Sequence, residues 1–411
     1  MLKGSSKDQL FKEKVYISLL TGVQIFNILD FVIILPMGPM LMRYFSISPF
    51  EFAALASSYS FSSAIVSFLY SSFADKYDRK KLLLTCLAGF ILATFICAIA
   101  PTYISFLGAR VIAGIFGGVL TPCVYAIIAE LIPFERRGKA LGTVMASFSL
   151  TSVLGIPTGL WIADTYGWRH AFHFIGAGAT VVFFFNIYFL PLIPQAPFNL
   201  KSREILTRII KIAINKDYRS AFISIFLMAF SGFLLFPFIA PYAVKNVGIQ
   251  ESELKFIYLV GGIFTIFASK FTGILTDKFG SLRLFFPTLF LSFISIHLYT
   301  TIENISLSTL LIISTSFMVL INARFIPVMK LITECPNAED RGSFMGFLMS
   351  VRNLASGAGP LVAGLIITET SESLENFNYS GYLSIFIGLI AIYFVLKMNR
   401  YIGSKQNAST D

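Results

Sequence analysis

The chain has 411 residues, of which 56% are hydrophobic and 13% are charged. A soluble domain is about 25% charged and about 45–50% apolar, so this composition excludes an ordinary soluble protein. The net charge is +10, but no basic stretch belongs to a soluble fold, and we expect no nucleic-acid partner. Basic residues beside membrane spans predict orientation instead.

Cysteine and histidine residues are few and scattered along the chain. They form no CxxC motif and no Cys/His cluster, so their spacing predicts neither a disulfide framework nor a metal site. A membrane-embedded enzyme would need a clustered nucleophile and base, or a set of metal ligands. The sequence offers neither, and we expect no catalytic site and no cofactor.

Long apolar segments dominate the chain and are separated by short polar breaks. A helix needs about 20 apolar residues to cross a bilayer. The pattern predicts an all-α membrane protein with twelve transmembrane helices. They are expected at roughly 15–42, 50–74, 82–100, 103–131, 139–163, 170–192, 219–244, 252–275, 284–301, 305–333, 342–368 and 379–398.

The longest inner break divides the chain into three parts. We expect an N-terminal six-helix half at 1–192, a cytoplasmic linker at 193–218 and a C-terminal six-helix half at 219–411. The linker mixes basic and apolar residues at helical spacing, which predicts a helix lying on the membrane surface.

The placement of basic residues predicts the orientation. The side of the membrane that holds the N-terminus carries 23 lysines and arginines, whereas the opposite side carries 4. Cytoplasmic loops hold the excess of basic residues in membrane proteins. Both termini are therefore predicted to be cytoplasmic.

The two halves repeat one another. Asp75 follows the second span as Asp277 follows the eighth, at an offset of 202 residues. Glu130 ends the fourth span as Glu334 ends the tenth, at an offset of 204 residues. Paired six-helix repeats are typical of transporters that work by alternating access.

Three motifs resemble those of the major facilitator superfamily, and in particular its drug:proton antiporter branch. Residues 71–80 resemble the loop pattern G-x-L-A-D-R-x-G-R-K, and residues 110–114 resemble the fourth-span pattern R-x-x-Q-G. Residues 154–159 resemble the fifth-span antiporter motif, although Ile156 separates Gly155 from Pro157. The resemblance implies the major facilitator fold, a bacterial inner (plasma) membrane location and a monomer.

The resemblance also implies a gate at the cytoplasmic ends of the helices, which locks the halves together when the outer side is open. Asp75 would face the start of the eleventh span near Gly342, and Arg79 would pair with Glu130. Asp277, Arg283 and Glu334 would form the mirror site in the second half. The predicted gate comprises Asp75, Arg79, Lys80, Glu130, Asp277, Arg283, Glu334 and Arg341. The alternative is that these charges only set the topology.

Asp30 lies near the middle of the predicted first span, roughly 24 Å from its start at 1.5 Å per residue. An ionisable residue at this depth is a candidate for function. Burial and a nearby cation act in opposite directions on a carboxyl group, which would let Asp30 bind and release a proton. The alternative is a static pair with Arg110, which lies at similar depth. For Arg110 the resemblance implies a part in proton transfer, and the alternative is a salt-bridge anchor.

A polar stripe accompanies Asp30, because Gln24 and Asn27 share its helical face. We expect these three residues to face a substrate cavity, together with Arg324 of the tenth span and Asn353 of the eleventh. Gly155, Pro157 and Gly159 would form a hinge in the fifth span, or serve helix packing alone.

The leading interpretation is a secondary transporter that exports a small organic molecule, such as a drug, sugar or metabolite, in exchange for protons. A proton-coupled importer or facilitator on the same fold is the alternative. The expected partners are the substrate, protons and lipid, with the proton gradient as the energy source. The sequence does not identify the cargo.

Overall fold

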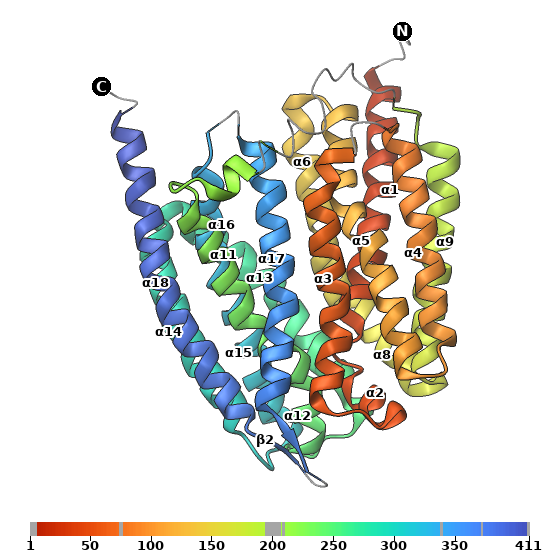
Figure 1. The fold of residues 1–411 in the computed structure, drawn as a ribbon, viewed down its shortest axis with the longest axis vertical. Helices are drawn as coiled ribbons and strands as arrows, with labels where there is room; N and C mark the ends of the chain where they lie inside the picture. The colour runs from red at the N-terminus through yellow and green to blue at the C-terminus, as the bar shows by residue number, and fades with distance from the viewer. Residues whose placement is uncertain are drawn as a thin grey trace.

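The computed structural model describes residues 6–73, 77–193, 207, 210–337, 340–370 and 373–408. Its helices form two bundles side by side, and both termini lie at the same end of the molecule (Figure 1). We call this end the terminal end and the other the far end. The predicted linker helix falls largely on 194–206 and 208–209, outside the described residues, while 210–214 are helical.

The first bundle contains the helices that precede the linker. They are α1 (Ser6–Ile33), α2 (Gly38–Phe45), α3 (Pro49–Phe73), α4 (Arg79–Ile99), α5 (Tyr103–Leu131), α6 (Phe134–Met145), α7 (Ser147–Leu150), a π-helical turn (Thr151–Gly155), α8 (Ile156–Tyr166) and α9 (Trp168–Phe189). Local signals begin two of them. Asp78 caps α4 by accepting a hydrogen bond from the Lys81 amide, and Thr102 and Ser105 form a capping box at α5.

The second bundle contains the helices that follow the linker. They are α11 (Arg219–Phe233), a 3₁₀ turn (Phe236–Phe238), α12 (Ile239–Lys245), a second 3₁₀ turn (Glu251–Glu253), α13 (Leu254–Phe279), α14 (Ser281–Thr301), α15 (Leu307–Ala323), α16 (Phe325–Glu334), α17 (Arg341–Ile366) and α18 (Phe377–Ala408). Strands β1 (Thr368–Glu369) and β2 (Leu374–Glu375) pair antiparallel between α17 and α18, with Thr368 opposite Glu375.

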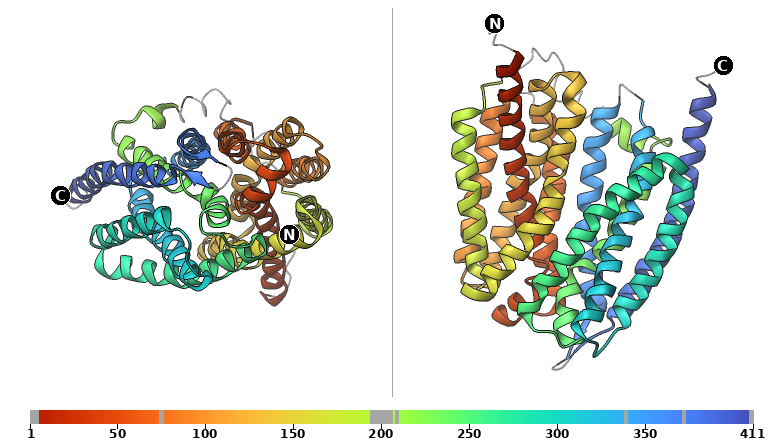
Figure 2. Two further views of the ribbon diagram at one scale, coloured as in Figure 1. Left: turned by 90° about the horizontal axis from the view of Figure 1, so that it is seen from below. Right: turned by 180° about the vertical axis from the view of Figure 1, so that it is seen from behind.

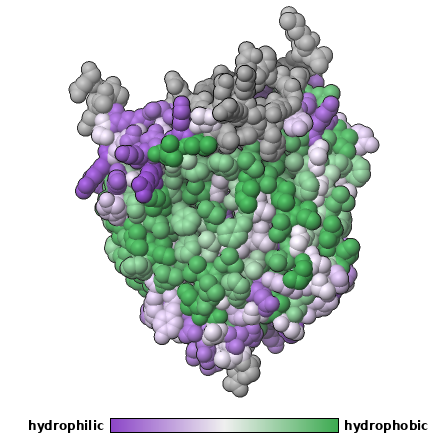
Figure 3. Space-filling view, in the orientation of Figure 1, coloured by the Kyte–Doolittle hydropathy of each residue, from purple (hydrophilic) through white to green (hydrophobic). Residues whose placement is uncertain are grey.

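Eleven helical stretches in the described part of the chain are long and apolar enough to cross a membrane. The 26-residue α17 runs beside them as the twelfth, and it is more polar because it carries Arg352 and Asn353. On the face shown in Figure 3, apolar side chains cover the middle of the molecule, and polar side chains gather above and below them. The prediction of an all-α, twelve-helix membrane protein is therefore confirmed.

Helix boundaries depart from the prediction where a helix continues beyond the apolar stretch. Helix α1 starts nine residues before the predicted span and ends at Ile33, where α2 follows after a turn. Helix α18 runs on to Ala408 through Lys397, Arg400 and Lys405. Hydropathy marks the bilayer rather than the helix, and basic side chains extend a helix into the interface. The β1–β2 hairpin was not predicted.

The two bundles share a core at the far end and have separate cores at the terminal end. One buried apolar cluster combines Leu41 and Phe52 of the first bundle with Leu234 and Phe238 of the second. Towards the terminal end, one cluster lies within residues of the first bundle and another within residues of the second. The halves are thus closed against each other at the far end, and the bundles splay towards the terminal end (Figure 2).

Candidate functional site

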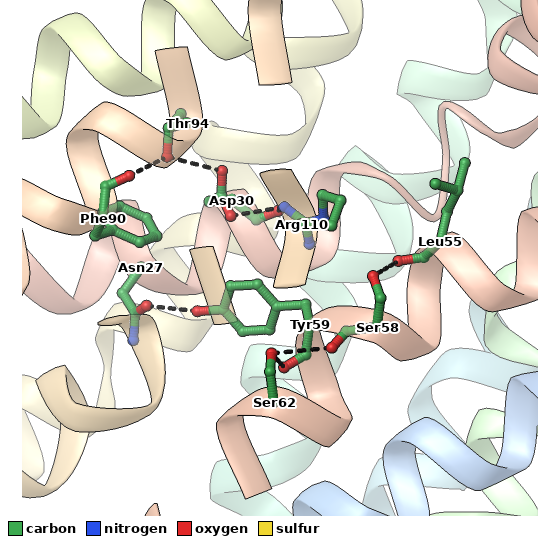
Figure 4. Close-up of polar contacts among 9 residues, drawn as sticks. All are labelled: Asn27, Asp30, Leu55, Ser58, Tyr59, Ser62, Phe90, Thr94 and Arg110. Atoms are coloured by element: carbon green, nitrogen blue, oxygen red, sulfur yellow. Dashed lines mark hydrogen bonds and ion pairs between the residues drawn. The ribbon is translucent and has the colours of Figure 1, made fainter. Parts of the chain in front are cut away.

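A buried ion pair joins α1 to α5. The Arg110 Nη1 atom lies 2.7 Å from Asp30 Oδ2, and both side chains are 0% exposed. The same nitrogen donates to the Asp30 carbonyl oxygen at 3.1 Å, and the Thr94 hydroxyl of α4 donates to Asp30 Oδ1 at 3.2 Å (Figure 4). Asp30 lies three residues from the end of α1, nearer the far end than the predicted mid-span position, because the helix ends at Ile33.

Glycines on α5 bring α3 close enough to complete this site. A Cβ atom at Gly114 would lie 2.1 Å from Ser62 Oγ, and one at Gly117 would lie 2.0 Å from the Tyr59 hydroxyl. Small residues allow helices to approach closely in this way. As a result the Tyr59 ring lies beneath the Arg110 guanidinium, 4.8 Å from its Cζ atom.

A hydrogen-bonded chain begins at Tyr59, whose ring contacts Arg110, and runs along α1 towards the terminal end. The Tyr59 hydroxyl donates to Asn27 Oδ1 at 2.7 Å. The Asn27 amide donates to the Thr121 hydroxyl at 3.3 Å, and that hydroxyl donates to Gln24 Oε1 at 3.0 Å. Gln24 and Asn27 of the predicted polar stripe therefore belong to one hydrogen-bonded chain. This chain meets the Asp30–Arg110 pair through the contact between the Tyr59 ring and Arg110.

The Arg110 guanidinium has unused donors. Its Nε and Nη2 atoms are buried and have no hydrogen-bond partner among the described residues. An unsatisfied buried donor costs about 1–3 kcal/mol, and more when it is charged. This geometry suits a group that exchanges partners better than one built for a single static arrangement.

A second buried arginine occupies the other bundle. Arg324 is the residue between α15 and α16, and it is 1% exposed. Its Nη2 atom donates to Ser231 Oγ of α11 at 2.9 Å, and its Nη1 atom donates to Ser292 Oγ of α14 at 3.2 Å. Within the described residues, its hydrogen bonds are to hydroxyl groups and it makes no ion pair. The structure places Arg324 inside the second bundle rather than between the two.

Arg352 and Asn353 of α17 lie where the two bundles meet. The Asn353 amide donates to Ser63 Oγ of α3 at 3.2 Å. The half-buried Arg352 has its Cζ atom 5.6 Å from the centre of the Phe325 ring. Its electrostatic neighbour in the first bundle is Tyr125 of α5. Neither a hydrogen bond nor an ion pair holds the Arg352 guanidinium within the part of the chain that the structure describes.

The predicted gate residues of the first half lie at the terminal end. Arg79 Nε is 3.0 Å from Glu130 Oε1, which is the predicted pair. Lys80 donates to the carbonyl oxygens of Ile187 and Leu190, so it caps the C-terminal end of α9. Asp75 lies outside the described residues, and its predicted contact near Gly342 stays a prediction.

The mirror site of the second half has different partners. Asp277 Oδ1 is paired with Lys330 Nζ at 2.7 Å, whereas we expected it to join Arg283 and Glu334. Among the described residues, Arg283, Glu334 and Arg341 make no ion pair, and all three are exposed. The Arg79–Glu130 and Asp277–Lys330 pairs therefore each lie within one bundle.

Among the described residues, an ion pair joins the two bundles at the far end. Both Nη atoms of Arg43, on α2, contact the Glu251 carboxylate before α13, at 2.5 and 3.0 Å. This hydrogen bonding raises the pKa of Arg43. The pair borders a pocket of 730 Å³ that both bundles line. Within the second bundle, Lys245 also pairs with Glu369 nearby.

The predicted hinge coincides with an irregular helix. The π-helical turn ends at Gly155, and two residues later Pro157 has no amide hydrogen to donate within the helix. A Cβ atom at Gly159 would lie 2.7 Å from Ile33 Cδ1, so this glycine also lets α1 pack closely. Helix α13 crosses this turn at Gly262, where an added Cβ atom would lie 3.1 Å from the Ser152 carbonyl oxygen.

Sequence reasoning did not identify four hydroxyl residues of these sites. Tyr59 stands in a serine-rich span, and that polarity was a usable signal. Thr94, Ser231 and Ser292 lie in largely apolar helices that carry further serine and threonine residues. Such hydroxyls usually bond to the preceding turn of their own helix, as Thr94 also does to the Phe90 carbonyl. Only the packing of the helices shows which of these hydroxyl residues contact the buried arginines or Asp30.

Comparison with known proteins gives consistent matches. The sequence profile of the Major Facilitator Superfamily matches residues 20–216 and 221–411. The uncharacterized MFS-type transporter YceJ of Bacillus subtilis is 24% identical over 384 residues, which cover 90% of this chain and 92% of that protein. Multidrug resistance protein 3 of the same organism is 38% identical over 122 residues, covering 29% and 24%.

One solved structure covers nearly the whole fold. It is a bacterial homolog of the human lysosomal transporter Spinster, in an inward-facing and unoccupied conformation. It superposes with a TM-score of 0.79 at 16% identity, covering 98% of this chain and 99% of that chain. At this identity the likeness concerns the fold.

Proposed function

Because the chain belongs to the Major Facilitator Superfamily, a family of membrane transporters, we propose that it exports a small organic molecule in exchange for protons by alternating access. The observation that carries the proposal is the Asp30–Arg110 pair, which is fully buried between membrane-spanning helices. Charges at this depth are costly and mark ion and proton pathways in transporters.

The chemistry of the pair suits proton coupling. While Asp30 is ionised, it neutralises Arg110 and the two helices are held together. A proton on the Asp30 carboxyl would remove that attraction and leave the guanidinium, two of whose nitrogens already lack partners, in need of another acceptor. Protonation would then change the relative energies of two conformations, and only such a difference can shift their equilibrium.

The hydrogen-bonded chain through Tyr59, Asn27, Thr121 and Gln24 supports a polar connection from the pair towards the terminal end. In the proposed cycle the described form is the one open to the terminal end. Its shared core at the far end and its separate cores at the terminal end support this assignment. Formation of gate contacts between the bundles would close the terminal end in the opposite form.

Orientation and location belong to the same proposal. The 23-to-4 distribution of basic residues favours cytoplasmic termini, so that the terminal end would face the cytoplasm. We place the protein in the bacterial inner membrane, as a monomer. The local similarity to Multidrug resistance protein 3 supports export.

The test uses a bacterial host without its own efflux pumps. Wild-type protein and Asp30→Asn would be expressed at matched membrane levels, and growth would be scored against toxic dyes, antibiotics, nucleosides and sugar analogues. We expect resistance to one chemical class, lost in Asp30→Asn. Resistance that survives in Asp30→Asn would remove this residue from the coupling step, and increased sensitivity of cells with the wild type would indicate uptake instead of export.

A further inference from the structure

The charged side chains in the membrane-spanning part of the two bundles are not balanced in charge. In the first bundle, Asp30 neutralises Arg110. In the second bundle, Arg324 is enclosed by hydroxyl groups and Arg352 has no hydrogen-bond or ion-pair partner among the described residues. The acidic residues of the second half whose side chains are described all lie near helix ends or in loops, such as Asp277, Glu303 and Glu334. No carboxylate of the described chain is therefore positioned to neutralise Arg352.

Arg352 is deep in the membrane-spanning part. It is the twelfth of the 26 residues of α17, which places it about 17 Å along the helix at 1.5 Å per residue. The hydrocarbon core is about 30 Å thick, so Arg352 lies near its middle. A guanidinium at this depth is costly unless an anion or water accompanies it.

Arg352 also has neighbours from both bundles. Its neighbours are Phe325, from the second bundle, and Tyr125, from the first. The next residue, Asn353, reaches across to Ser63 of α3. A molecule bound here would touch both bundles, as a substrate must if its binding is to influence their relative position.

We propose that Arg352 is the anion-binding residue of the substrate site, and that the substrate is an organic anion whose carboxylate, sulfonate or phosphate pairs with this guanidinium. The planar guanidinium matches such oxyanions with two parallel hydrogen bonds. The Phe325 ring supplies an apolar surface beside the charge, which suits an aromatic or aliphatic body. This inference rests on the proposed transport function, because it names the class of molecule carried.

The experiment measures binding without a proton gradient. Purified protein would be heated in detergent with four probes that share one ring system: naphthoate, naphthalenesulfonate, the cation naphthylmethylammonium and the neutral naphthylmethanol. A ligand of the native state raises the unfolding temperature in proportion to its affinity. We expect at least one of the two anions to stabilise the wild type, and the cation and the alcohol to have no effect.

Variants then assign the binding to Arg352. Arg352→Gln should weaken anion binding by about tenfold or more, as expected for the loss of a charge-assisted hydrogen bond, and Arg352→Lys should weaken it less. Lys270→Gln is the matched control, because it removes the same charge from an exposed position on α13 and should bind like the wild type.

Three results would overturn the inference. They are the absence of stabilisation by either anion, equal stabilisation by the cation or the alcohol, and unchanged anion binding in Arg352→Gln. If Arg352→Gln does not fold, the Arg352→Lys variant and the comparison of the four probes on the wild type still test the inference. Loss of the proton-coupled export function would appear in the Asp30→Asn growth assay and would leave this binding result unaffected, so the two failures are distinguishable.

Discussion

The two bundles place an arginine in equivalent surroundings but give it different partners. Arg110 of the fourth span contacts Asp30 of the first span, and Asp30 in turn binds Thr94 of the third. Arg324 of the tenth span contacts Ser231 of the seventh and Ser292 of the ninth. One site therefore contains a carboxylate where the other contains a hydroxyl.

This difference separates a site that can titrate from one that cannot. A carboxylate can gain a proton and release its arginine, whereas a serine hydroxyl stays neutral at every physiological pH. Repetition of the same helix arrangement thus yields one switchable contact and one fixed contact. We infer that the first bundle responds to protons and that the Ser231–Arg324 contact holds the second bundle together.

The largest expected effect is on the charged site. Asp30→Asn leaves the Arg110 guanidinium buried without its counter-ion, and breaking a buried pair in this way costs about 3–5 kcal/mol. The double variant Asp30→Asn with Arg110→Gln removes both charges and should recover a large part of this loss. Unfolding in mixed detergent micelles measures the stability of the single and the double variant. Equal stability of the single and double variants would contradict the account.

The hydroxyl site should be less sensitive. Ser231→Ala removes one neutral acceptor from Arg324 and should cost about 1–3 kcal/mol, because Ser292 still accepts a hydrogen bond. Ser224→Ala on the same helix is the control, since its buried hydroxyl has no partner among the described residues and its removal should cost little. The same unfolding assay applies, and a loss as large as that of Asp30→Asn would show that the two sites are energetically alike.

A smaller effect is expected at the rim of the charged site. Tyr59→Phe keeps the ring beneath Arg110 and removes the hydrogen bond to Asn27, worth about 0.5–1.5 kcal/mol. Tyr258→Phe removes a buried hydroxyl that has no partner among the described residues and should be neutral or slightly stabilising. If the hydroxyl chain contributes to proton movement, Tyr59→Phe should also slow transport more than Tyr258→Phe does. Equal rates would limit Tyr59 to packing.

The smallest effect on stability is expected for the pair between the bundles at the far end. Arg43→Gln removes an ion pair whose arginine is largely exposed, and such surface pairs contribute about 0–1 kcal/mol. The same change should shift the protein away from the form that is closed at the far end, since this pair exists only when the bundles meet there. Labelling of a cysteine introduced at Ile47, which is buried in this form, would increase in Arg43→Gln. Unchanged labelling would show that apolar packing alone keeps this end closed.

The sequence was sufficient for the fold because hydropathy, spacing and the internal repeat each reflect the bilayer directly. It also identified Asp30 and Arg110, since two ionisable residues in apolar spans are conspicuous without any structure. It did not assign partners in the second bundle. Asp277 pairs with Lys330 rather than with the expected residues, because long flexible side chains at helix ends have several acceptors within reach.

Arg324 and Arg352 also show that the sequence does not predict the partners of a side chain in the membrane-spanning part. Arg324 was predicted to face the cavity, but the break between α15 and α16 directs it into the second bundle. Arg352 was not selected, although it lies between the bundles. Periodicity gives the face of a helix, but which neighbour covers that face depends on how twelve helices pack.

The most direct test of the central claim separates transport from coupling. Wild-type protein and Asp30→Asn would be reconstituted in proteoliposomes with the cargo found in the growth assay. Exchange of labelled for unlabelled cargo at equal pH would be compared with accumulation driven by a pH gradient. The account predicts that Asp30→Asn retains exchange and loses gradient-driven accumulation. Accumulation by Asp30→Asn at the wild-type level would show that Asp30 does not carry the coupled proton.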